Sequence, residues 1–203
     1  MRLVLHVILL LLPALPAMSE DVSLDLPQPG SVSRAEGLDA FARIYEVTSH
    51  PRCANCHVAT NTPMWTGPSF DRPGPHGMNI TAGSSRIGAE HLLCSTCHTE
   101  LQEDRPDAND DPHAAPRVAH AWRLPPVEFA WFDKSPREVC EQLRTPETNG
   151  GMTFVDLAEH VNHCPLVHWG WAPGGTREPA PYSLKAHTRD ILLWGAAAMP
   201  CPQ

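Results

Sequence analysis

Cys53-Ala54-Asn55-Cys56-His57 and Cys94-Ser95-Thr96-Cys97-His98 are two copies of the pattern Cys-x-x-Cys-His. This spacing is typical of covalent attachment of c-type haem, because two thiols add across the two vinyl groups of one porphyrin. The histidine that follows is then held beneath the iron as its proximal ligand. We therefore expect two covalently bound haems, one held by Cys53, Cys56 and His57 and the other by Cys94, Cys97 and His98.

Two other kinds of site use Cys-x-x-Cys pairs. A thioredoxin-like redox pair needs one motif beside a βαβ pattern, and no such pattern surrounds either pair. A zinc ribbon usually separates its two pairs by roughly 15–20 residues, whereas 37 residues lie between Cys56 and Cys94. A ribbon also has no need of a histidine directly after each pair. The two motifs therefore indicate haem attachment.

Residues 1–17 have the form of a secretory signal peptide. Arg2 supplies the positive start, an apolar run follows from Leu3 to Leu12, and small residues lead to a cleavage site after Ala17. The run is shorter than the roughly 20 residues that span a bilayer, and a retained membrane anchor is the alternative. No second apolar run follows, so we expect no membrane span in the mature chain. Haem attachment to thiols also belongs outside the cytoplasm, which predicts a periplasmic protein.

Proline makes up 22 of the 203 residues, about twice its average share of ~5%. We therefore expect a mainly α fold with extensive irregular loops, in which short helices surround two covalently bound c-type haems. Residues 18–32 are predicted to be an extended or disordered lead-in, and residues 33–203 a single dihaem cytochrome domain. Within that domain, 33–117 form a pair of haem-binding repeats and 118–203 a helical cover.

The chain is acidic. Its formal charge of −8 becomes −9 when Arg2 is lost with the signal peptide, and haem propionates add further negative charge. This balance argues against nucleic acid as a partner. An acidic face suits a basic redox partner, although an ordinary soluble periplasmic surface explains the charge equally well.

Helix start signals occur at several places. Ser33 and Glu36 have the spacing of a capping box, and an apolar face follows at three- and four-residue steps, so a helix is predicted to deliver the chain to Cys53. A second short helix is expected near 87–93, before Cys94. Further helices are predicted from Ser135 to about Leu143, from Thr153 to about His160, and after Ser183.

The residue opposite each proximal histidine decides whether the iron transfers electrons or binds a substrate. Each motif is followed, a loop's length later, by a Pro-His pair that contains His76 or His113. We therefore predict His76 and His113 as distal ligands, each for its own haem, which gives two bis-histidine haems at low potential. The alternatives are methionines: Met64, Met78, Met152 and Met199.

A second group of potential ligands lies near the C-terminus: His160, His163, Cys164 and His168. Imidazole and thiolate at this short spacing suit zinc or copper. One of these side chains could instead be a distal haem ligand. The third interpretation is a polar helix end that covers the second haem.

Three cysteines lie outside the haem motifs: Cys140, Cys164 and Cys201. An oxidising compartment favours pairing of two of them. Cys201 belongs to a Pro-Cys-Pro tail that would otherwise fray, and Cys140 lies inside a predicted helix. We therefore predict a Cys140–Cys201 disulfide, with Cys164 as the odd thiol, buried or directed at a haem.

With these motifs the chain resembles small periplasmic dihaem c-type cytochromes. The two haem motifs, with Pro75-His76-Gly77-Met78-Asn79 and Trp194-Gly195-Ala196-Ala197, look similar to bacterial proteins filed as isoquinoline 1-oxidoreductase subunits. That resemblance implies association with a molybdenum hydroxylase that oxidises N-heterocycles or aldehydes. The chain has neither the cysteine pattern of a [2Fe–2S] subunit nor the length of a molybdopterin subunit, so the implied role is that of an electron acceptor.

Electron transfer is the predicted function: the haems receive electrons from a periplasmic dehydrogenase, or another cytochrome, and pass them toward the respiratory chain. A non-catalytic role is favoured over an enzymatic one. The alternative is a haem enzyme, such as a dihaem peroxidase or a sulfur-compound oxidase, with one open or thiolate-ligated haem. Cys164 is the residue that suggests it. Haem-based sensing would need a signalling domain that the sequence does not contain.

Overall fold

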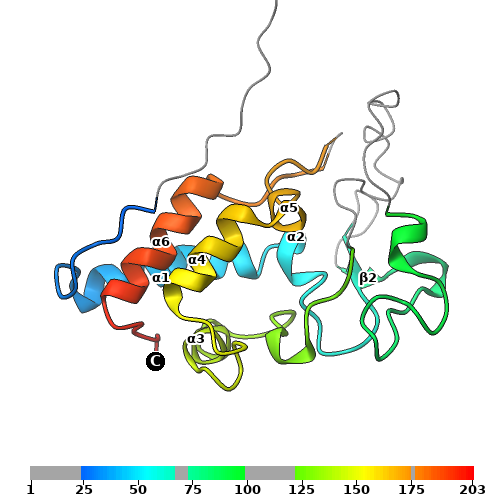
Figure 1. Ribbon diagram of the computed structural model, residues 1–203, viewed down its shortest axis with the longest axis horizontal. Coiled ribbons are helices and arrows are strands. Elements are labelled where there is room, and N and C mark those ends of the chain that lie inside the picture. The colour runs from blue at the N-terminus through cyan, green and yellow to red at the C-terminus, as the bar shows by residue number, and fades with distance from the viewer. Residues whose placement is uncertain (1–23, 67–72, 99–121, 175–176) are drawn as a thin grey trace, which may run out of the picture.

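The computed structural model describes residues 24–66, 73–98, 122–174 and 177–203. These residues form short helices joined by long irregular segments (Figure 1). This arrangement confirms the predicted mainly α class. The helices and strands, in chain order, are α1 (Arg34–Thr48), α2 (Pro51–Ala54), β1 (Met64–Trp65), β2 (Gly74–Pro75), the 3-10 helices η1 (Gly77–Asn79), η2 (Cys94–Thr96) and η4 (Val127–Phe129), α3 (Pro136–Arg144), α4 (Phe154–His163), α5 (Pro165–His168) and α6 (Leu184–Ala196).

Side chains cap the starts of the four longest helices, as the sequence predicts. Ser33, Ser135 and Thr153 each accept a hydrogen bond from the backbone three residues later, and the acidic residue there bonds back to the cap. These reciprocal bonds satisfy backbone donors that a helix start leaves free. Ser183 caps α6 with a single bond to the Ala186 amide. The predicted helices at 33, 135, 153 and 183 are therefore confirmed, and α4 continues to His163.

The main core lies where α6 packs between α1 and α4 (Figure 1). Close backbone approach requires glycine at two points of this packing. A Cβ on Gly195 would lie 2.1 Å from the Phe154 ring, and one on Gly37 would lie 2.4 Å from Ala197 Cβ. The largest fully buried side chains include Trp194 and Phe41, whose ring centres are 5.4 Å apart. Helices α3 and α6 thus pack directly against α1, which leads into the first motif.

A buried ion pair joins α1 to α6. Arg43 donates to both carboxylate oxygens of Asp190, with Nε–Oδ2 at 2.9 Å and Nη2–Oδ1 at 2.6 Å. The Asp190 side chain is 6% exposed and that of Arg43 is 38% exposed. Two parallel bonds to a planar carboxylate fix the relative orientation of both helices.

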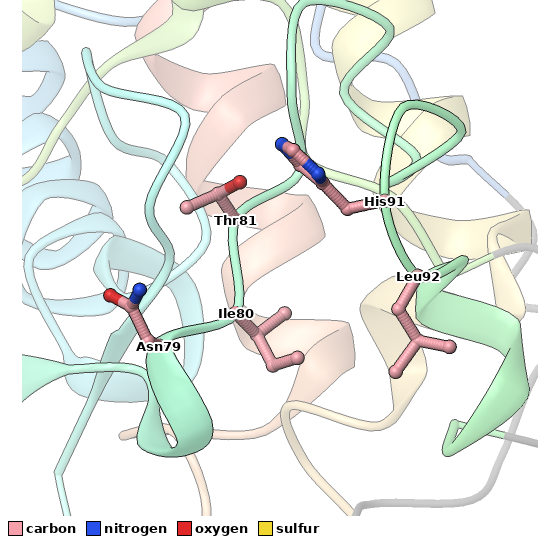
Figure 2. A pocket seen from close by; sticks show the side chains of 5 residues that line it. All are labelled: Asn79, Ile80, Thr81, His91 and Leu92. Atoms are coloured by element: carbon pink, nitrogen blue, oxygen red, sulfur yellow. The ribbon is translucent and has the colours of Figure 1, made fainter.

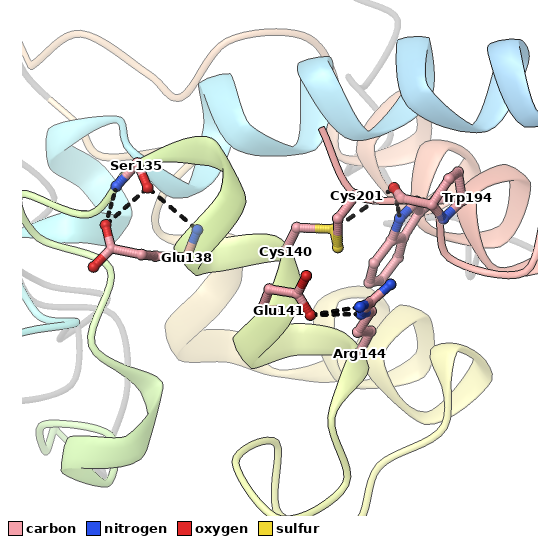
Figure 3. Close-up of a disulfide and its surroundings, with 8 residues drawn as sticks. Ser135, Glu138, Cys140, Glu141, Arg144, Trp194 and Cys201 are labelled. Atoms are coloured by element: carbon pink, nitrogen blue, oxygen red, sulfur yellow. Dashed lines mark hydrogen bonds and ion pairs between the residues drawn. A yellow bond between two sulfur atoms is a disulfide. The ribbon is translucent and has the colours of Figure 1, made fainter. Parts of the chain in front are cut away.

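The predicted disulfide between Cys140 and Cys201 is present, and its Cα atoms are 5.6 Å apart. It ties the tail that follows α6 back to α3 (Figure 3). The same tail is fixed by Trp194, whose indole N–H donates to the Pro200 carbonyl oxygen at 3.1 Å. The last residues are therefore part of the folded domain.

The helix predicted near 87–93 is wrong. This segment runs through turns, and the backbone angle φ is +66° at Arg86 and +80° at Gly88. Left-handed angles at both positions interrupt a right-handed helix. Arg86 instead holds the loop through its guanidinium, which donates to the carbonyl oxygens of Pro125, Thr60 and Val58.

Several sequence predictions lie outside the described residues: the signal peptide 1–17, the start of the lead-in 18–32, and His113. Residues 24–32 have no helix or strand. Among the described helices, none is long and apolar enough to cross a membrane.

Candidate haem-attachment site

The first motif follows the end of α1 directly. His50 caps α2, Pro51 occupies its first position, and Cys53 lies on its last turn. The motif continues through Cys56 to His57, and neither cysteine forms a disulfide. Burial raises the pKa of Cys53 to about 12 and that of Cys56 to about 11. The structure therefore presents two protonated thiols next to a histidine, at the end of a well-packed helix.

The His57 ring is held by η4 and by the segment that follows it. Its Nδ1 lies 2.7 Å from the Phe129 carbonyl oxygen. Because a carbonyl can only accept, Nδ1 carries the proton and the lone pair is on Nε2. The backbone N–H groups of Trp131 and Phe132 donate to the His57 carbonyl oxygen at 2.8 and 3.0 Å. The Trp131 ring is parallel to the imidazole, with centres 3.5 Å apart.

This environment is the one that metal-ligating histidines usually have, with one nitrogen hydrogen-bonded to the protein and the other available. Burial lowers the pKa of His57 to about 4, so the ring is neutral at physiological pH. Trp131 is itself fixed, since its indole N–H donates to Gln142 Oε1 at 2.8 Å. Phe129 could not be identified from the sequence, because every residue has a carbonyl group.

The second motif begins on η2, in the irregular segment that follows Arg86. Cys94 is half-buried and Cys97 exposed, and neither forms a disulfide. The His98 ring is half-buried and lies 4.2 Å from the Trp122 ring, centre to centre. Burial first, and then the charge that a Cys94 thiolate would carry, raises the pKa of Cys56, which indicates that the two motifs lie near each other.

Buried indole N–H groups without a partner occur in the described part of the chain, and those of Trp122 and Trp169 lie beside these motifs. Among the described residues, the buried Nε1 atoms of Trp122, Trp169 and Trp171 have no hydrogen-bond acceptor. Trp122 contacts Trp169, with ring centres 5.5 Å apart, and Arg52 lies over the Trp169 ring. Buried donors without a partner are costly. They would be satisfied by an acidic group in this region, and haem propionates are such groups.

Positive charge gathers at the same place. Burial, and then the charge of Arg177, lowers the pKa of Arg52. Arg52 also donates through Nε to the Glu178 carbonyl oxygen at 2.8 Å. The Arg52 guanidinium over the Trp169 ring, whose indole donor has no partner, favours an anionic ligand. The residues present therefore fit haem on three counts: unpaired thiols, a histidine with an available nitrogen, and a polar wall suited to carboxylates.

His76 lies beside the second motif, although the sequence pattern predicts it for the first. Its ring centre is 6.2 Å from that of His98. Among the methionines, Met64 packs on a small cluster that includes Val58 and Leu124. Met78 is 79% exposed. Met152 and Met199 pack against the main core.

The C-terminal group of potential ligands does not gather into one site. Among the described residues, no three histidine, cysteine or acidic side chains form a group that could hold a metal ion. His163 Nδ1 bonds to the Glu159 carbonyl oxygen and His168 Nε2 to that of Asn162. His160 is the member near the first motif, since its charge lowers the pKa of His57. Cys164 forms the junction of α4 and α5 and is half-buried.

His187 is a buried histidine that the sequence analysis missed. It is 4% exposed on α6, and its ring lies 5.5 Å from that of Trp171. A signal was present, because His187 occupies the apolar stripe of α6 between Leu184 and Ile191. Burial lowers its pKa to about 4.

We expect His187 to make stability depend on pH. Its imidazole takes up a proton below about pH 6.5 in the unfolded chain but only below about pH 4 in the folded one. The contribution of His187 to the free energy of unfolding is therefore complete above pH 6.5 and is lost progressively as the pH falls toward 4. Between pH 7.5 and pH 5 the loss is about 2 kcal/mol. Urea unfolding of the wild type and of His187→Gln at both pH values measures it, and the variant should lose less on acidification.

The control for this prediction is His91→Gln, which removes an exposed histidine. It should keep the pH dependence of the wild type. Equal pH dependence in His187→Gln and the wild type would show that His187 is protonated alike in both states, and would contradict the prediction.

A small pocket lies between the first and second motifs along the chain (Figure 2). Its lining residues are Asn79, Ile80, Thr81, His91 and Leu92, and its volume is about 280 Å³. This is slightly below the roughly 300–1,000 Å³ of ordinary ligand pockets. It contains neither motif histidine.

Comparison of the chain with protein-family models, curated proteins and solved structures found no match.

Proposed function

We propose that this chain is a periplasmic dihaem c-type cytochrome that transfers electrons. Cys53 and Cys56 would hold the first haem, with His57 as its proximal ligand. Cys94 and Cys97 would hold the second, with His98 as its proximal ligand. The observation that supports this best is the His57 environment, in which a carbonyl fixes Nδ1 and leaves Nε2 available beside two unpaired thiols.

The surrounding residues have defined roles in this proposal. Haem iron held by thioether bonds and histidine supplies reversible one-electron chemistry. The Phe129 carbonyl orients His57 and makes Nε2 more basic. Trp131 fixes the plane of the imidazole by stacking, and Gln142 holds Trp131 in turn. Trp122, Trp169 and Arg52 supply donors and positive charge for carboxylate groups.

Electron transfer suits this arrangement better than catalysis does. Cys94 lies within electrostatic range of Cys56, so haems at both motifs would be neighbours. Neighbouring redox centres allow electrons to pass from one to the other. The donor in this proposal is a periplasmic dehydrogenase, of which a molybdenum hydroxylase is one class, and the acceptor belongs to the respiratory chain.

Haem content is the direct test. We expect the chain, produced with its signal peptide in a bacterium that matures c-type cytochromes, to carry two covalent haems by intact mass and by haem staining of a denaturing gel. Cys53→Ala/Cys56→Ala and Cys94→Ala/Cys97→Ala should each lose one. The control Cys164→Ala should keep both. A protein without covalent haem would refute the proposal.

Spectra separate electron transfer from the enzyme alternative. Two low-spin haems in the oxidised protein, with no binding of CO after reduction, would support electron transfer. A high-spin or thiolate-ligated haem would instead support a haem enzyme, and loss of a thiolate signature in Cys164→Ala would identify its ligand.

A further inference from the structure

We infer that His76, which follows the first motif, is the distal ligand of the haem attached at the second motif, where it forms an axial pair with His98. This rests on the proposed function, since it assumes haem at Cys94 and Cys97. It differs from the sequence pattern, which assigns to each motif the Pro-His that follows it. The axial pair would then join the segment between the two motifs to the second motif.

The separation of the two rings carries the inference. The ring centres of His76 and His98 are 6.2 Å apart. An imidazole nitrogen binds a transition metal at about 2 Å, and the ring centre lies about 1 Å behind that nitrogen. Two imidazoles that share one metal ion therefore have centres roughly 6 Å apart. The planes are inclined by 57°, which is compatible with two rings rotated about a common axis.

The tautomer of His76 suits a ligand. Its Nδ1 lies 2.9 Å from the Gly77 carbonyl oxygen. Because a carbonyl accepts, Nδ1 carries the proton and Nε2 the lone pair. His57 is held in the same way by Phe129. A backbone carbonyl that fixes the second nitrogen is the usual environment of a metal-ligating histidine.

A hairpin built on the first motif positions His76. The Met64 N–H donates to the Asn55 carbonyl oxygen at 2.8 Å, which places β1 against the first motif. Strand β2 pairs with β1 in antiparallel register, with Pro75 opposite Met64. The His76 N–H then donates to the Pro63 carbonyl oxygen at 2.9 Å. His76 is therefore anchored to the first motif while its ring lies beside the second.

The first motif is engaged by other groups. The ring that stacks on His57 is Trp131, and the ring contact of His76 is with His98. The alternative ligand beside it along the chain, Met78, is 79% exposed. The backbone of His76 is therefore held by the first motif, whereas the ring contact of its imidazole is with the histidine of the second.

The test is His76→Ala in chains that hold one haem each. In Cys53→Ala/Cys56→Ala, which keeps only the second haem, His76→Ala should convert the haem from low spin to high spin and create CO binding. In Cys94→Ala/Cys97→Ala, which keeps only the first haem, His76→Ala should change neither the EPR nor the optical spectrum. His91→Ala, at an exposed histidine of the same segment, should leave both haems low-spin. His76→Met should restore a low-spin second haem at a raised potential.

The reverse pattern, a change only in the chain that keeps the first haem, would overturn the inference, as would unchanged spectra in both. If a one-haem chain does not accumulate, NMR of the reduced two-haem protein decides. Nuclear Overhauser contacts should join the His76 ring to the thioether bridges at Cys94 and Cys97, and contacts with those at Cys53 and Cys56 would contradict the pairing. If only this inference is wrong, the protein still carries two covalent haems. If the proposed function is wrong, it carries no covalent haem.

Discussion

Replacement of both Cys140 and Cys201 by alanine is expected to lower the free energy of unfolding by about 3 kcal/mol. The disulfide closes a long loop, with 61 residues of separation, and most of its effect comes from restricting the unfolded chain. It also positions the tail, where the Pro200 carbonyl oxygen accepts from the buried Trp194 indole. Urea unfolding of the oxidised protein, followed by far-ultraviolet circular dichroism, measures the loss.

A mild phosphine reductant is the matched control, because it opens the disulfide without changing any side chain. It should destabilise the wild type by a similar amount and leave the double variant unaffected. The thioether bonds of the proposed haems would not be reduced in this way, so the expected haem content should not change. A double variant as stable as the wild type would show that packing alone holds the tail.

Arg43→Ala is expected to destabilise the protein by about 3 kcal/mol. The substitution leaves the Asp190 carboxylate, 6% exposed, without its cation in the contact between α1 and α6. An unpaired buried charge is far more costly than a lost surface ion pair, which contributes at most about 1 kcal/mol. Since Arg43 is itself partly exposed, water that enters the gap should keep the loss at the lower end of the usual range.

Arg34→Ala is the control, since it removes an exposed arginine from the first turn of the same helix. It should change stability by less than about 0.5 kcal/mol. Arg43→Ala/Asp190→Asn should recover part of the loss, because the buried carboxylate is then neutral. A loss below 1 kcal/mol for Arg43→Ala would show that this pair behaves as a surface pair.

The helices could be predicted from the sequence because their signals are local. A capping box such as Ser33 with Glu36 satisfies backbone groups within one turn, and the apolar stripe that follows needs only one partner face. The helix predicted at 87–93 was wrong for the opposite reason. Its conformation depends on Arg86, whose guanidinium binds carbonyl groups of residues some 26 to 39 positions away. Such long-range bonds leave no local pattern.

The candidate site also contains features that the sequence predicts and features that it does not. The cysteines and histidines of the two motifs are identified by spacing, because the attachment chemistry itself fixes that spacing. The position of His76 in the structure cannot be predicted from spacing, because it depends on how the β1–β2 hairpin folds back on Asn55. The carbonyl partner of His57 is equally invisible in the sequence, because Phe129 contributes through its backbone.

The anchored tail also determines how the protein can be handled. Pro200 and Ala197 lie against Gly37 at the start of α1, whereas Cys53 follows its end. A helix of 15 residues is about 22 Å long, so the two sites lie at opposite ends of α1 (Figure 1). An affinity tag or an electrode linker joined after Gln203 would therefore emerge about one helix length from the first motif, and would leave that end of the molecule open to the redox partners proposed above.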